Sequence, residues 1–161
     1  MATQLEKSSD NGGSSGAEVY SGYETCKQKV LELLQELGLP RGLLPLQYIE
    51  ECGYVRDTGF VWIKRKKKLE YRYKASGVLA SYAPEVTCFV EKRKMKKING
   101  VKIRELLVWL PLTELSIQDS NTHMIYCKTG LGVGKSMPIR LWEEEYDKYM
   151  SKIDVTPPAE T

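Results

Sequence analysis

The chain has 161 residues, 42% of them apolar, and a net charge of +3, which predicts one globular domain with a modest core. It contains no apolar run near the roughly 20 residues of a membrane-spanning helix, and its first 16 residues lack the apolar segment of a secretory signal. We therefore expect a cytoplasmic protein, either peripheral to a membrane or able to enter the nucleus.

The ends of the chain differ in composition from its middle. Residues 1–20 are rich in Ser, Gly, Asn and charged residues, and they predict a disordered tail. Residues 151–161 predict a flexible C-terminal tail for the same reason. A single domain is expected over residues 21–150.

The first predicted element is an amphipathic helix over residues 23–37. Ser21 and Glu24 have the spacing of a capping box at its start, and Gly38 followed by Pro40 predicts its end. Its apolar residues recur at intervals of three and four, as one helix face requires: Cys26, Val30, Leu33, Leu34 and Leu37.

Residues 38–54 combine two prolines and a glycine with several leucines. Pro40, Gly42 and Pro45 favour an irregular loop, whereas Leu43 and Leu44 would anchor that loop in the core.

From residue 54 onward the pattern predicts short strands. Residues 69–75 (LEYRYKA) alternate cleanly, with Tyr71 and Tyr73 on the apolar face. The Asn99-Gly100 pair predicts a two-residue hairpin turn, and residues 101–117 contain two strand-like runs. Residues 123–129 and 136–142 also have strand-like patterns, and residues 143–152 are compatible with a short terminal helix.

Together these elements predict a mainly β fold. We expect a small antiparallel β-barrel or curled sheet of about seven or eight strands, with the N-terminal helix packed on it.

Residues 129–136, TGLGVGKS, resemble a phosphate-binding loop. In that motif the first glycine stands six residues before the lysine, where this chain has Thr129. A strand-like segment containing Pro138 follows instead of a helix. We therefore predict a glycine-rich hairpin turn with no nucleotide site, in which Lys135 is at most a further contact for an anionic partner.

No catalytic or metal-binding pattern stands out. The four cysteines are dispersed and are expected to be free and mostly buried, and His123 is the single histidine. No metal or cofactor is expected, and an enzyme is the less favoured interpretation.

The charge of the chain is distributed unevenly. Residues 60–104 contain 14 Lys and Arg against 3 Asp and Glu, a net charge of +11, and the remainder carries −8. Two clusters account for most of this excess, and hairpin geometry could bring them to one surface. The candidate binding residues are Lys64, Arg65, Lys66, Lys67, Lys68, Lys92, Arg93, Lys94, Lys96 and Lys97.

Three interpretations of these basic residues stay open. They could bind an anionic lipid or membrane surface, where each basic residue contributes about 1 kcal/mol. They could bind nucleic acid, with Tyr71 and Tyr73 stacking on bases, although both tyrosines share the predicted core face. They could also be solvated turns that protect strand edges from aggregation.

Several segments in matching order resemble one family. ELGLPRGLLP (residues 36–45), DTGFVWI (57–63), GVLASYAPEV (77–86) and GVKIRELLVWLPLTELSI (100–117) are similar to the plant domain of unknown function number 538. The resemblance covers about residues 30–142, and LPRGLLP is its most specific part.

The resemblance implies a β-barrel-like fold with an accompanying helix, and an association with plant stress and development. It also implies two candidate activities, lipid binding and hydrolysis of a hydrophobic ester such as chlorophyll. We expect a non-enzymatic module that binds a lipid-like ligand or an anionic membrane, with ester hydrolysis or nucleic-acid binding as alternatives.

Overall fold

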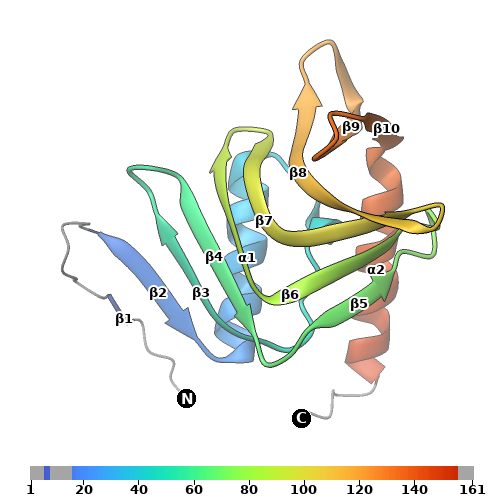
Figure 1. The fold of residues 1–161 in the computed structure, drawn as a ribbon. Coiled ribbons are helices and arrows are strands. Elements are labelled where there is room, and N and C mark those ends of the chain that lie inside the picture. Colours follow the sequence, from blue (N-terminus) through green and yellow to red (C-terminus); the bar gives the residue numbers. More distant parts are fainter. Residues whose placement is uncertain (1–5, 8–15, 156–161) are drawn as a thin grey trace.

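The computed structural model describes residues 6–7 and 16–155, in which ten strands form one antiparallel sheet accompanied by two α-helices (Figure 1). The strands pair in the order β1-β2-β3-β4-β6-β7-β8-β9-β10, and β5 pairs with β6 outside this path. The elements are β1 (Glu6–Lys7), β2 (Ala17–Ser21), α1 (Tyr23–Leu37), the 3₁₀ turn η2 (Arg41–Leu43), β3 (Ile49–Val55), β4 (Phe60–Arg65), β5 (Leu69–Arg72), β6 (Leu79–Glu91), β7 (Lys94–Glu105), β8 (Val108–Gln118), β9 (Asn121–Thr129), β10 (Gly134–Pro138) and α2 (Ile139–Val155).

The predicted mainly β fold is confirmed, and of the two predicted forms it is the curled sheet rather than the closed barrel. The sheet curls, and both helices lie behind it in Figure 1. The first and last strands of the pairing order do not pair with each other, so the sheet is not closed into a barrel.

The curl has a local cause in β6 and β7, which both bend sharply midway (Figure 1). Tyr82 pairs with Val101 and Thr87 pairs with Asn99, so residues 83–86 of β6 stand opposite the single residue Gly100. Gly100 has φ +100°, and a β-carbon there would lie 2.7 Å from the Glu85 carbonyl oxygen. Such a bulge bends a strand and increases its twist.

The prediction of a hairpin turn at Asn99-Gly100 is therefore wrong, because this pair lies inside β7. The turn between β6 and β7 is formed by Lys92 and Arg93, since Glu91 pairs with Lys94. Arg93 adopts a left-handed conformation there, with φ 60°.

The predicted helix α1 is confirmed, and its apolar face joins the core through Cys26, Val30, Leu34 and Leu37. Gly38 ends it with φ 75°, as predicted. The predicted capping box is wrong: the N-cap is Gly22 and no side chain caps it. Ser21 is instead paired in β2.

The loop after α1 is anchored in the core, as the leucines predicted. Leu39, Leu43 and Leu46 are buried, and the η2 turn holds Gly42 against the backbone of α2. This contact positions α2 beside the sheet.

Both chain ends differ from the prediction. Residues 17–20 belong to β2, which pairs along β3, so the predicted disordered tail was wrong there. Residues 139–142 and 151–155 belong to α2 rather than to a strand and a tail. The rest of the two predicted tails lies outside the described residues, apart from β1 and Gly16.

Candidate functional site

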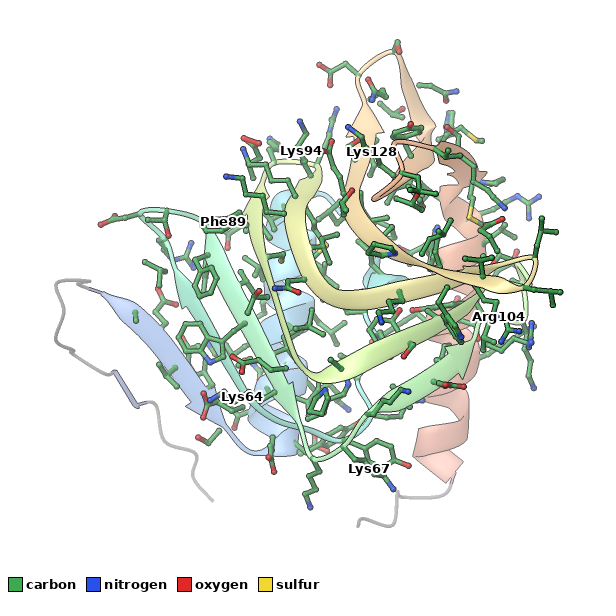
Figure 2. The ribbon with its side chains drawn as sticks, viewed as in Figure 1. Lys64, Lys67, Phe89, Lys94, Arg104 and Lys128 are labelled. Carbon is green, nitrogen blue, oxygen red and sulfur yellow. The ribbon has the colours of Figure 1, made fainter. Side chains whose placement is uncertain are left out.

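The ten predicted basic residues do not share one surface. Lys64 pairs with Glu85 midway along β6, whereas the 92–93 turn follows the C-terminal end of β6. The six residue-to-residue steps from Glu85 to Glu91 span about 20 Å at about 3.3 Å per step. Figure 2 accordingly shows Lys64 and Lys67 far from Lys94.

Most of these residues already have partners on the protein surface. Lys67 lies over the ring of Tyr48 and Lys97 over that of Phe89. Half of the ten form ion pairs with carboxylates: Lys64 with Glu51, Lys68 with Glu70, Arg93 with Asp119, Lys94 with Glu114 and Lys96 with Glu91. Lys66 and Lys92 are exposed. This arrangement favours the interpretation of solvated turns over a dedicated binding surface.

Arg65 differs from the other nine because it is 4% exposed. Its guanidinium group donates hydrogen bonds to the carbonyl oxygens of Pro45 and Gln47 and lies 5.3 Å from the Tyr82 ring centroid. The prediction that it belongs to a surface site is therefore wrong. Arg65 follows Val61 and Ile63 on the inward face of β4, so the strand alternation places it in the core.

The most distinctive feature is an apolar cavity of about 200 Å³ on the inner side of the sheet. Strands β6 to β10 supply most of its wall, and Leu43 and Trp142 close it from the η2 turn and from α2. The lining residues are Leu43, Tyr73, Val78, Ala80, Tyr82, Val101, Ile103, Glu105, Leu110, Leu112, Leu115, Cys127, Thr129, Val133, Gly134, Lys135, Met137 and Trp142.

The charged residues of this lining lie at the opening of the cavity. Glu105, Val133 and Lys135 are partly or fully exposed, whereas Trp142 and Leu43 are buried at its inner end. Lys135 Nζ and Glu105 form an ion pair of 3.5 Å that connects β10 to β7. The cavity thus has an apolar interior and a charged rim.

Two tyrosines place polar atoms in the wall without leaving them unpaired. The hydroxyl groups of Tyr73 and Tyr82 form a buried hydrogen bond of 2.6 Å. Burial raises the pKa of Tyr82 to about 12 and raises that of Tyr73 well above its ordinary value. In contrast, the buried Nε1 of Trp142 has no hydrogen-bond partner among the described residues.

Raising the pH above about 10 is expected to lower the free energy of unfolding. Tyr73 and Tyr82 ionise near pH 10 in the unfolded chain, whereas burial keeps them protonated to higher pH in the folded state. The stabilisation that the two neutral tyrosines provide is complete below about pH 10. It is lost as the pH rises from about 10 through about 12, by about 1.4 kcal/mol per pH unit for each tyrosine. Urea unfolding at about pH 8, 10 and 11 measures it.

Tyr82→Phe provides the control for this prediction. It removes one of the two titrating hydroxyls, so the free energy of unfolding should fall less steeply with pH than in the unaltered protein. Equal slopes for the two proteins would contradict the assignment.

The TGLGVGKS stretch forms the hairpin between β9 and β10, which confirms the predicted glycine-rich turn. The Thr129 backbone amide donates to the Val133 carbonyl oxygen, and Gly132 provides the left-handed residue with φ 81°. Lys135 and Ser136 are paired in β10. No helix begins at the lysine, so its amides cannot form a phosphate-binding ring.

The four cysteines are free and buried, as predicted. Burial raises the pKa of Cys88 to about 12 and that of Cys127 to about 11, so both stay neutral thiols at physiological pH. In the described part of the chain, no cluster of three or more His, Cys, Asp or Glu is placed to hold a metal ion. His123 is exposed at the start of β9 and does not line the cavity.

The tyrosines considered for base stacking face inward. Tyr73 is 3% exposed, and the half-buried Tyr71 donates a 2.8 Å hydrogen bond to Glu145 of α2. Their rings pack edge to face, with centroids 4.7 Å apart. Tyr71 and Tyr73 therefore connect the sheet to α2 and present no stacking surface.

The fold and cavity define a class: a mainly β domain in which a curled sheet and a C-terminal helix enclose an apolar site. The family model described as "Protein of unknown function, DUF538" matches residues 30–143, and the chain belongs to this family. Searches of curated proteins and of solved structures found no match. Within residues 6–7 and 16–155, no helix has both the length and the apolar character needed to cross a membrane.

Proposed function

We propose that this domain binds a small apolar or amphiphilic, lipid-like molecule in the cavity between the sheet and α2. The observation that carries the proposal is an apolar interior whose charged residues lie only at its opening. A cavity of about 150 Å³ is enough to bind benzene, so about 200 Å³ accommodates a larger ring or a segment of an acyl chain.

The position of the charges indicates the chemistry of the ligand. An apolar tail would contact Ile103, Leu112 and Leu115 inside, while a polar head group would remain near Lys135 and Glu105 at the opening. Burial of apolar surface would drive binding, and the rim would orient the molecule. A lipid-like amphiphile has both parts.

The groups in the cavity wall support binding rather than hydrolysis. The Cys127 thiol is protonated because burial raises its pKa, and the Thr129 hydroxyl donates its proton to the Val133 carbonyl oxygen. Neither has a neighbouring histidine in the lining to act as a base. A binding role is compatible with the stress and developmental processes that the family resemblance implies.

Filling the cavity is expected to abolish binding. Cys127→Phe places a ring inside, so the affinity for N-phenyl-1-naphthylamine, measured by its fluorescence, should fall by about tenfold or more. Decanoate should displace the same probe from the unaltered protein.

Lys128→Phe is the matched control. It introduces the same side chain at the next position of β9, which is exposed and labelled in Figure 2, so binding should be unchanged. Circular dichroism checks that both variants are folded. Equal probe affinity in the two variants would refute the cavity as the binding site.

A further inference from the structure

Large apolar side chains are exposed on two hairpins at the opening of the cavity. The β7–β8 hairpin exposes Leu106 and Leu107 by 92% and 83%, and the β9–β10 hairpin exposes Leu131 and Val133 by 71% and 62%. With Val108, these are five of the six large apolar residues that are exposed in the described part of the chain. Apolar surface gathered in this way marks a site of interaction.

The β7–β8 turn is unfavourable for leucine. Glu105 pairs with Val108, so Leu106 and Leu107 alone form the turn, and Leu106 has φ 57°. Glycine or asparagine adopts this conformation at much lower cost. Folding alone therefore does not favour leucine at this tip, which points to a contact outside the domain.

Two arginines lie beside this tip. Arg72 and Arg104 line a shallow depression that reaches Leu106, and within residues 6–7 and 16–155 neither forms an ion pair with a carboxylate. The guanidinium of Arg104 lies 5.4 Å from the ring centroid of its cross-strand neighbour Trp109. Figure 2 shows Arg104 at the β7–β8 end of the sheet, away from Lys64 and Lys94.

The two hairpins and the cavity form one continuous surface. Val133 at the tip of one hairpin lines the cavity together with Glu105 at the base of the other. The Lys135–Glu105 ion pair links the bases of the two hairpins. The lining of the cavity therefore includes residues of both hairpins.

We propose that these hairpins dock the domain on an anionic lipid bilayer, with the leucine tips inserted and Arg72 and Arg104 at the phosphate groups. Leucine in the acyl region, tryptophan at the interface and arginine at the phosphates match the layers of a membrane surface. The inference rests on the proposed function, because docking would present the cavity opening to lipid.

The test uses sedimentation with phosphatidylcholine vesicles, with and without about 30% phosphatidylserine. The double variant Leu106→Gly/Leu107→Ser has residues that favour a two-residue turn, so its stability should equal or exceed that of the unaltered protein. Its binding to anionic vesicles should nevertheless fall by about tenfold or more. Arg104→Gln should weaken anionic binding about fivefold, whereas Lys66→Gln in the distant basic cluster should leave it within about twofold.

The outcomes separate docking from ligand binding. The double variant should still bind N-phenyl-1-naphthylamine in solution, and Cys127→Phe should still bind vesicles. If the unaltered protein sediments with vesicles but does not bind the probe, the result counts against the cavity alone. Docking is overturned if the unaltered protein does not sediment with anionic vesicles, or if the double variant sediments equally well. Loss of sedimentation on Lys66→Gln but not on Arg104→Gln would instead assign docking to the other basic cluster and refute this surface.

Discussion

Arg65→Met is expected to lower the free energy of unfolding by about 2–4 kcal/mol. The guanidinium group is buried and satisfies the carbonyl oxygens of Pro45 and Gln47. Methionine fills a similar volume but donates no hydrogen bond, so both carbonyl groups would lose the guanidinium as a partner. Urea unfolding followed by circular dichroism measures the loss.

Lys66→Met is the matched control for this prediction. It removes the same charge from the next residue, which is exposed, and the free energy of unfolding should change by less than about 0.5 kcal/mol. Equal losses in the two variants would show that net charge, rather than burial, determines the effect.

Gly42→Ala is expected to lower the free energy of unfolding by about 3 kcal/mol and to weaken ligand binding as well. A β-carbon on Gly42 would overlap the carbonyl oxygen of Trp142, so α2 would have to move away from the η2 turn. Because Trp142 forms part of the cavity wall, that movement would alter the site. Unfolding and probe binding should therefore both respond.

Gly77→Ala separates crowding from backbone strain. Gly77 has φ 80° and open space around its α-carbon, so alanine there costs only the strain of a left-handed residue, about 1–2 kcal/mol. Probe affinity should be retained in Gly77→Ala and reduced in Gly42→Ala. A Gly42→Ala protein with unchanged stability would contradict the close contact between η2 and α2.

Elements determined by local pattern could be predicted from the sequence. Helix α1 has periodic apolar residues and a glycine stop. Of the two loop leucines expected in the core, Leu43 is buried and Leu44 packs against the core partly buried. The alternation over residues 69–75 assigned Tyr73 to the apolar face, and Tyr73 is buried. These features depend on residues that are only a few positions apart in the sequence.

Turns determined by long-range packing could not be predicted. Asn99-Gly100 has the composition of a hairpin turn, but Gly100 is required where β7 crosses close to the Glu85 carbonyl oxygen. The true turn residues, Lys92-Arg93 and Leu106-Leu107, lack the usual turn composition. The apolar run around Leu106 indicated strand, which concealed an exposed tip.

The cavity could not be predicted for a related reason. Alternation shows that Val101 and Ile103 face inward, but whether their side chains meet those of β8 depends on the bend at Gly100 and the position of α2. Charge density instead pointed to the run around Lys66. The inward alternation Val61, Ile63, Arg65 was the available signal that this run is not uniformly exposed.

The most direct test is a methyl-resolved NMR titration of the unaltered protein with decanoate. If the cavity binds an acyl chain, the methyl signals of Ile103, Leu112 and Leu115 should shift together, with intermolecular contacts to the chain. The methyl signals of Leu33, on the other side of the core, should stay in place. Shifts confined to residues outside the cavity lining, or no shifts at saturating decanoate, would contradict the cavity as a binding site.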